Sequence, residues 1–212
     1  MRVLLTGGSR GIGAAIKAVF KSHGHEVHSP TREEIDLSEV PYVEDPTYDI
    51  VVNNAGINPI SELNELNYEE DYVMKVNYFS PLHIIKQCLP YMVKNGYGRI
   101  VNIGSIWTKL SKPGRSNYSA SKCALDSLSR SITAEYAKNG VLCNTVSPGF
   151  ILTDLTLQNN TEEELDSIKR SVPVNRLGDC REVADLVYYL TVNNTFITGQ
   201  NILIDGGYTC VA

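Results

Sequence analysis

The sequence predicts an α/β fold, in which one doubly wound parallel sheet carries helices on both faces. Short β-rich runs alternate with segments of helical length along the 212 residues, and such alternation is typical of parallel sheets. A glycine-rich turn joins the first run to the first helical segment. No internal repeat, low-complexity tract or flexible linker interrupts the chain, so we expect a single domain over residues 1–212.

Strands are expected where apolar and β-branched residues form short runs. In chain order the candidates are Val3 to Leu5, His25 to His28, Ile50 to Asn53, Arg99 to Ile103, Leu142 to Val146 and Ile202 to Ile204. Two long helices are predicted, from Tyr68 to Lys94 and from Ser119 to Ala137, because apolar residues recur there at helical spacing. Gly96 and Gly140 are placed to end these helices.

The segment from Pro30 to Asp49 is short for the connection it has to make. Neighbouring parallel strands are normally joined by a crossover of a dozen or more residues that includes a helix. After His28 the chain passes Ile35 to Leu37 and soon reaches the strand candidate at Ile50, which leaves little room for full crossover helices. We therefore expect the sheet to be trimmed near its second and third strands. A site at the carboxyl ends of the central strands need not be affected.

Composition restricts the class of partner. A formal charge of -5 and a pI near 5.4 argue against nucleic acid or a membrane surface as partner, which leaves a small molecule. No signal sequence and no apolar run long enough to span a bilayer is recognised, so we expect a cytoplasmic protein. The five cysteines show no CxxC pair or Cys/His cluster, and we expect no metal site.

The glycine-rich turn directly follows the first strand candidate. Thr6 to Gly13 reads TGGSRGIG, and Ala14 to Phe20 reads as a helix. A pyrophosphate needs backbone N–H groups at a helix N-terminus with no Cβ in the way, and glycines at these spacings permit that approach. Glycines alone could simply form a turn. The order strand, glycine turn, helix nevertheless favours a Rossmann-type dinucleotide site.

Further motifs follow the glycine turn in order. Asn53 to Gly56 (NNAG) ends one strand candidate, Ser105 closely follows another, and Tyr118 to Lys122 (YSASK) opens a helix. Together with the TGxxxGxG form of the turn, these motifs resemble the short-chain dehydrogenase/reductases. The similarity continues through Asn77, Pro148-Gly149, Thr153, Ile197 to Gln200 and Asp205 to Gly207, and so covers nearly the whole chain.

Within that family the sequence is most similar to the 3-oxoacyl-carrier-protein reductases, by Pro148 to Ile151, Thr153-Asp154 and Arg176 to Gly178. This resemblance implies reduction of a 3-oxoacyl thioester on an acyl carrier protein by a nicotinamide cofactor. It also implies a homotetramer, in which the two long helices pack against their mates, and a substrate lid at Glu162 to Lys169. The shortened segment at Pro30 to Asp49 departs from the family pattern near the adenine end of the cofactor.

The resemblance assigns the site residue by residue. The catalytic set is Asn77, Ser105, Tyr118 and Lys122. The cofactor set is drawn from the glycine turn, the loop after the second strand, the NNAG motif, the catalytic helix and the Pro-Gly motif. It comprises Gly7, Ser9, Arg10, Gly11, Ile12, Gly13, Arg32, Asp36, Leu37, Asn53, Ala55, Gly56, Tyr118, Lys122, Pro148, Gly149, Ile151 and Thr153.

Ketone reduction needs a proton donor, and a free tyrosine with a pKa near 10 is a slow acid at neutral pH. Lys122 lies one helical turn after Tyr118 and could favour the phenolate by its charge. Ser105, at the end of a central strand, could hydrogen bond the substrate carbonyl. By resemblance, Lys122 also binds the nicotinamide ribose and Asn77 relays protons through water. Taken singly, these residues could equally be a helix-surface tyrosine, a solvated lysine, a turn serine and a helix cap.

The choice of nicotinamide depends on the end of the second strand. NAD-preferring sites usually carry an acid there, whereas an arginine accommodates the 2′-phosphate of NADP. The sequence from Val27 to Arg32 contains no acid, and the first is Glu33. Arg10 and Arg32 could together hold the phosphate, unless Arg32 is merely exposed. We favour NADP(H) over NAD(H).

The substrate is less closely defined by the sequence. Arginines that family members present for the carrier protein are replaced by Gly96 and Asn139. Lys109, Lys112 and Arg115 form a basic cluster between Ser105 and Tyr118, which could steer an anionic carrier or could simply be a solvated loop. An alcohol, sugar or steroid dehydrogenase remains an alternative, as does a catalytically idle nucleotide-binding scaffold.

Overall fold

The computed structural model describes residues 1–65, 71–158 and 161–211. Its centre is a six-stranded sheet with the order β2-β1-β3-β4-β5-β8, in which every neighbouring pair is parallel. The strands are β1 (Arg2–Thr6), β2 (Glu26–His28), β3 (Ile50–Asn53), β4 (Gly98–Ile103), β5 (Val141–Pro148) and β8 (Asn201–Ile204). The predicted doubly wound parallel sheet is confirmed.

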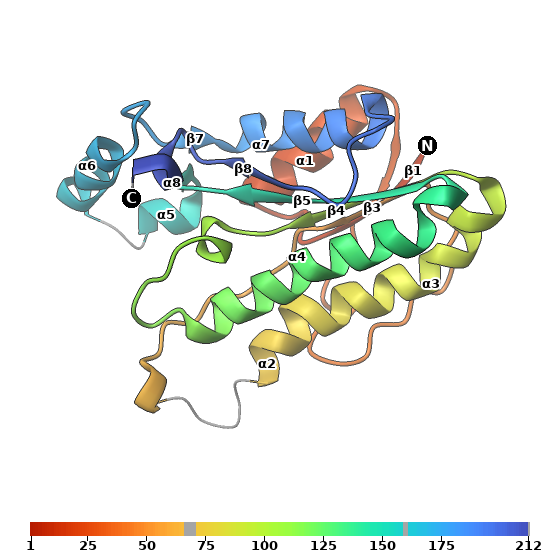
Figure 1. Cartoon of the computed structure of the whole chain (residues 1–212), viewed down its shortest axis with the longest axis horizontal. Helices are drawn as coiled ribbons and strands as arrows, with labels where there is room; N and C mark the ends of the chain where they lie inside the picture. The colour runs from red at the N-terminus through yellow and green to blue at the C-terminus, as the bar shows by residue number, and fades with distance from the viewer. Residues whose placement is uncertain (66–70, 159–160, 212) are drawn as a thin grey trace.

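Two layers of helices cover the sheet (Figure 1). One face carries α1 (Gly11–Ser22) and α7 (Cys180–Tyr188), which pack on each other. The other face carries α3 (Ser80–Asn95) and α4 (Ser116–Tyr136). Short elements complete the described chain: α2 (Asp71–Met74), α5 (Asp154–Gln158), α6 (Glu162–Ser171), α8 (Tyr208–Val211) and a small parallel pair, β6 (Ile151–Leu152) with β7 (Gly178–Asp179). In the described part of the chain, no helix is long and apolar enough to cross a membrane.

The central strands read as unbroken apolar runs because both faces of the sheet are buried. Val3 and Leu5 point to the α1 and α7 side, whereas Leu4 points to the α3 and α4 side. β3 repeats this alternation, with Val51 in the second cluster and its neighbours in the first. Two apolar layers therefore hold the sheet and fix where the carboxyl ends of its strands meet.

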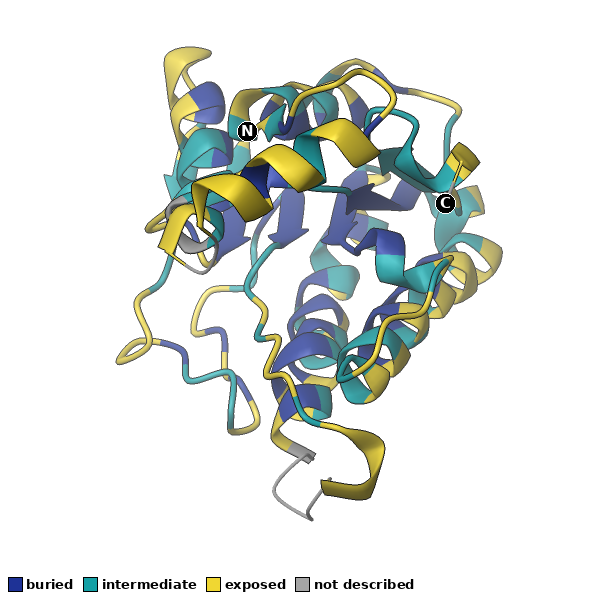
Figure 2. Cartoon of the chain, turned by 90° about the vertical axis from the view of Figure 1, so that its left-hand side faces the viewer, coloured by how far each residue is buried: buried dark blue, intermediate teal, exposed yellow. Residues whose placement is uncertain are grey.

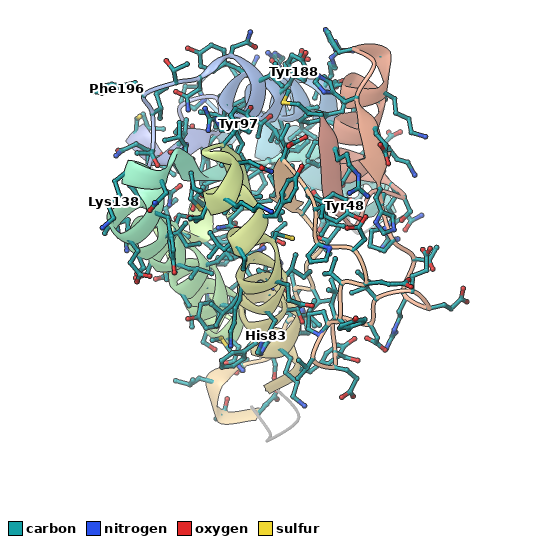
Figure 3. The ribbon with its side chains drawn as sticks, turned by 90° about the vertical axis from the view of Figure 1, so that its right-hand side faces the viewer. Tyr48, His83, Tyr97, Lys138, Tyr188 and Phe196 are labelled. Carbon is teal, nitrogen blue, oxygen red and sulfur yellow. The ribbon has the colours of Figure 1, made fainter. Side chains whose placement is uncertain are left out.

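The edge of the sheet at β2 is trimmed, as predicted. β2 has only three residues, and residues 31–49 form neither a helix nor a strand. Ile35, Val43 and Tyr48 from this segment are buried against the α3 side of the sheet and replace a crossover helix as apolar cover. The Tyr48 hydroxyl hydrogen bonds His28, and its ring lies near the edge strands in Figure 3.

The two long helices differ from their predicted bounds in detail. The first is helical from Asp71 to Asn95 but includes a π-helical stretch at Lys75–Phe79, while its predicted start at Tyr68 lies outside the described residues. The second begins three residues earlier than predicted, because α4 starts at Ser116. Gly96 and Gly140 end these helical stretches in left-handed conformations, with φ of 63° and 80°.

Candidate active site

The glycine turn is held by contacts that only glycine permits. A Cβ on Gly13 would lie 2.0 Å from the carbonyl oxygen of Gly7, and one on Gly8 would lie 2.3 Å from the Ser29 hydroxyl. Gly7 itself has a φ of 68°, which favours glycine. The turn leads into α1 at Gly11, whose first N–H groups receive no cap from the Arg10 side chain. Such a helix start can bind an anion.

Asn54 connects the NNAG motif to the glycine turn. Its side-chain amide donates to the carbonyl oxygens of Thr6 and Gly7, at 3.1 and 2.9 Å. The Thr6 hydroxyl in turn accepts the backbone N–H groups of Asn54 and Ala55, at 3.1 Å each. Asn53, in contrast, is buried and donates to Asn102 at 2.8 Å, so its side chain points into the core. Asn54 was not among the predicted site residues, yet it fixes the turn.

A cleft of about 520 Å³ runs from the glycine turn along the end of β2. It brings together predicted cofactor residues from three separate segments: Gly7, Ser9, Arg32, Asp36, Leu37, Ala55 and Gly56. Arg32 forms an ion pair with Asp36 at 3.4 Å. Hydrogen bonds from Ser38, helped by the Arg32 charge, lower the pKa of Asp36. Lys17 of α1 also lines this cleft and was not predicted.

Ser105, Tyr118 and Lys122 meet beyond the end of β4. Ser105 follows that strand and begins a short 3-10 helix, where its hydroxyl accepts the N–H of Trp107 at 3.3 Å. Tyr118 stands in the first turn of α4, near enough to Ser105 for that hydroxyl to act on the pKa of the phenol. Lys122 is buried, and its Nζ donates to the carbonyl oxygen of Ile103 at 2.8 Å, 5.7 Å from the centre of the Tyr118 ring.

The pKa values of Tyr118 and Lys122, at the catalytic corner that they form with Ser105, differ from those expected from the sequence. Removal from solvent raises the pKa of Tyr118, although the Ser105 hydrogen bond and the charge of Arg115 oppose this. The expected lowering of the pKa of Tyr118 by Lys122 is therefore not found. Burial instead lowers the pKa of Lys122 to about 8, because its ammonium has lost the stabilisation of water.

Asn77 lies inside the π-helical stretch, with helix on both sides, so it is not a helix cap. Its amide group donates to the Ile57 carbonyl at 2.9 Å and to the Ser121 hydroxyl at 3.0 Å, and its oxygen accepts the N–H of Ile57 at 2.9 Å. A Cβ on Gly56 would lie 3.2 Å from the Lys122 Nζ and 3.3 Å from the Asn77 oxygen. The two side chains therefore converge on Gly56.

The segment that follows β5 also reaches the glycine turn. A Cβ on Gly11 would touch the Thr153 methyl group at 3.4 Å, so Thr153 lies beside the start of α1. Gly149 packs so closely on Asp205 that a Cβ there would lie 2.7 Å from it. Pro148 and Ile151, the other predicted residues of this motif, are buried around it. Figure 2 faces this end of the molecule, where buried strands meet exposed coil.

A second cleft, of about 620 Å³, opens beside the first turn of α4. It lies between the loop 111–115 and residues 62–64, and Ser116 and Ser119 of α4 also line it. Lys112 and Arg115 of the predicted basic cluster line this cleft, while Lys109 is exposed beyond it.

Comparison with known proteins agrees with this geometry. Residues 43–209 match the family described as enoyl-(acyl carrier protein) reductase. A 3-oxoacyl-[acyl-carrier-protein] reductase from Vibrio cholerae is 33% identical, over 96% of this chain and 95% of that enzyme. The chain is a short-chain dehydrogenase/reductase. It is therefore an NAD(P)-dependent oxidoreductase that acts on C=O and CH–OH groups.

Other members of the family are similar to different extents. The 3-oxoacyl-[acyl-carrier-protein] reductase of Haemophilus influenzae is 38% identical over 161 residues, which cover 75% of this chain and 66% of that enzyme. The solved structure of 4-hydroxyisoleucine dehydrogenase complexed with NADH superimposes with a TM-score of 0.90 and 26% identity, over 99% of this chain and 98% of that one.

The residues of this short-chain dehydrogenase/reductase fit a nicotinamide dinucleotide. Because Gly8 and Gly13 lack a Cβ, the turn can pack closely on Ser29 and on the Gly7 carbonyl, and the uncapped start of α1 beside it can bind a phosphate. Asn54 and Lys17 lie in this region and were not among the predicted site residues. Thr6 pairs with Asn53 in the parallel register of β1 and β3, so the residue after Asn53 must lie beside the turn. Recognition of that pairing could have identified Asn54.

Proposed function

We propose that this short-chain dehydrogenase/reductase reduces the keto group of a 3-oxoacyl thioester, carried by an acyl carrier protein, with NADPH. The observation that carries the proposal is that Tyr118 and Ser105 interact beside the buried ammonium of Lys122. A proton donor, a second donor and a cation are thus placed together at the carboxyl end of a central strand, where ligands of such sheets bind.

The bound nicotinamide supplies the hydride. Tyr118 donates its hydroxyl proton to the carbonyl oxygen, and Ser105 hydrogen bonds the same oxygen as negative charge develops there. Lys122 has a pKa of about 8, so its Nζ can pass on a proton near neutral pH. Asn77 and Lys122 both lie beside Gly56. Asn77 thereby positions the end of the proton path at the Lys122 Nζ.

The residues on both sides of the glycine turn would hold the cofactor. Gly7, Ser9 and the residues Gly11 to Gly13 would bind the pyrophosphate at the start of α1. Asp36 and Leu37, with Ala55 and Gly56, line the adenosine side. Residues Pro148 to Thr153 would hold the nicotinamide side, and Lys122 would bind the ribose. We favour NADPH because Arg32 lines the adenosine cleft, Arg10 is exposed in the adjoining glycine turn, and the strand end from Val27 to Arg32 holds no acid.

A carrier-linked substrate is supported by the second cleft. Lys112 and Arg115 line it, and Arg115 directly precedes the α4 turn that carries Tyr118, so a phosphopantetheine could reach the catalytic corner past two cations. Lys138, near the position where relatives present a carrier-binding arginine, faces the opposite end of the molecule (Figure 3). The cluster at Lys109, Lys112 and Arg115 is therefore the docking surface in our assignment.

By resemblance, the working assembly is a homotetramer with α3 and α4 at one interface. Phe79 is 45% exposed at the start of α3, and Phe196 is 92% exposed near β8, where it projects from the molecule in Figure 3. Large apolar side chains exposed in this way are typical of subunit contacts. Light scattering at micromolar concentration should give four times the chain mass of 23.4 kDa, and a monomer mass would refute this assembly.

The test of the reaction is a substrate panel. NADPH oxidation is followed with acetoacetyl carrier protein, acetoacetyl coenzyme A, a small β-ketoester, a sugar and a steroid. The highest kcat/KM is expected for the carrier-linked substrate. A preference for the sugar or the steroid would reassign the substrate and leave the catalytic set in place, whereas no turnover of any carbonyl would point to a binding scaffold.

A further inference from the structure

We propose that Lys17 on α1 provides the positive charge that selects the 2′-phosphate of NADP(H), and that Arg32 serves mainly to neutralise Asp36. The inference deepens the proposed use of NADPH and rests on it. Lys17 lines the adenosine cleft together with the glycine turn and the loop Ser29 to Arg32. Nothing in the sequence pattern marked this residue.

The position of Lys17 follows from the helix that carries it. Lys17 lies four residues after Gly13, one turn farther along the same face of α1. α1 packs against β2, and Lys17 lines the same cleft as Ser29 and Thr31, which follow that strand. The ammonium on its four-carbon stem can therefore reach the ribose end of the cleft, where the Ser29 and Thr31 side chains stand.

The trimmed sheet edge gives Lys17 this access. Residues 31–49 form no helix or strand that could build a wall over the cleft beside β2. Lys17 is half-buried there, so its stem is held while its head stays in the cleft. A regular crossover would place further side chains in this space.

The charges of the cleft separate the roles of Lys17 and Arg32. Asp36 lines the same cleft and would repel a phosphate, but Arg32 holds it in an ion pair at 3.4 Å. Glu34 is engaged by the backbone N–H of Thr31 at 2.7 Å. Among the described residues, no carboxylate pairs with Lys17. Its charge is therefore free for a ligand, and a phosphate near it gains a charge-assisted hydrogen bond.

The experiment compares two nucleotides that differ only in the position of one phosphate. Binding of 2′,5′-ADP and of ordinary 5′-ADP is measured by calorimetry on the wild type, Lys17→Ala and the control Lys21→Ala. Lys21 is an exposed lysine on the same helix that does not line the cleft. Lys17→Ala should weaken 2′,5′-ADP about tenfold and leave 5′-ADP nearly unchanged, Lys21→Ala should change neither, and Lys17→Arg should restore the preference.

A second pair of variants tests the role of Arg32. Arg32→Ala should also weaken 2′,5′-ADP, because it leaves Asp36 unpaired, and the added change Asp36→Ala should recover most of that loss. Addition of Asp36→Ala to Lys17→Ala should not restore binding. Equal weakening of both nucleotides by Lys17→Ala, or no weakening, would overturn the assignment. A wild type that prefers 5′-ADP would overturn it together with NADPH use, while carbonyl reduction with NADH would still stand.

Discussion

The catalytic corner and the adenosine cleft of this enzyme are built in opposite ways. At the corner, Lys122 and Asn77 are buried on helices, and they hydrogen bond to the backbone of Ile103 and Ile57 and to the buried Ser121 hydroxyl. In the cleft, Arg32 and Asp36 stand on an irregular segment and are exposed or half-exposed. The proposed catalytic residues thus stand on regular elements, whereas the cleft proposed for adenosine is lined in large part by an irregular segment, which can change with little cost to the core.

Removal of the proton donor is the strongest way to test the catalytic corner. Tyr118→Phe should lower kcat about 10²- to 10⁴-fold, the range of general acid catalysis, while the dissociation constant of the cofactor stays nearly unchanged. The change deletes one hydroxyl and keeps the ring in place. Single-turnover kinetics and fluorescence titration of NADPH measure the two quantities. Turnover within about threefold of the wild type would remove Tyr118 from its assigned role.

Replacement of the buried lysine should separate activity from stability. Lys122→Met should abolish most turnover and weaken the cofactor, yet raise the free energy of unfolding at pH 7. The pKa of Lys122 is lowered from 10.5 to about 8, so the unfolded chain binds the proton more tightly and burial of the charge costs about 3 kcal/mol at neutral pH. The lost hydrogen bond to Ile103 offsets part of the gain.

The pH dependence gives the sign of this effect. Between the folded pKa of about 8 and the unfolded value of 10.5, the wild type gains stability as pH rises, because the unfolded state still binds a proton that the folded state has lost. The advantage of Lys122→Met should therefore shrink by more than half between pH 7 and pH 9.5, as measured by urea unfolding. An advantage that is independent of pH would show that packing, and not charge burial, is responsible.

A variant of Asn54 tests whether the glycine turn holds both cofactors equally or helps to select between NADPH and NADH. Asn54→Ala removes the two hydrogen bonds to Thr6 and Gly7, so it should weaken NADPH and NADH equally, by about tenfold. Asn58, exposed in the next loop, provides the matched control as Asn58→Ala. Fluorescence titration with both cofactors gives the comparison. Selective loss of NADPH would place Asn54 with the specificity residues instead.

The smallest effect is expected at the mouth of the second cleft. Neutralisation of Lys109, Lys112 and Arg115 together should raise KM for acetoacetyl carrier protein about five- to tenfold at low salt. At low salt the exposed charges are screened only weakly, so their attraction for an anionic carrier is largest. The KM of a small uncharged β-ketoester should not change. Steady-state kinetics at two salt concentrations measure the KM of both substrates. An unchanged KM for the carrier substrate would remove the docking role from this cluster.

Local patterns were enough to predict the frame of the molecule. The strands at Val3 to Leu5 and Ile50 to Asn53 lie within one or two residues of their expected bounds, because burial on both faces requires apolar runs. The trimmed edge followed from a count of residues between His28 and Ile50. Ser105, Tyr118 and Lys122 were named from ordered motifs, and the structure brings them together.

Long-range packing decided what the sequence by itself could not. The π-helical stretch around Asn77 and the raised pKa of Tyr118 depend on which groups surround them after folding. Asn54 and Lys17 enter the site through neighbours that are distant in the chain, at Gly7 and Ser29. Sequence periodicity reports which face of an element is buried, but the partners of a polar side chain and its loss of water are fixed only when the elements pack.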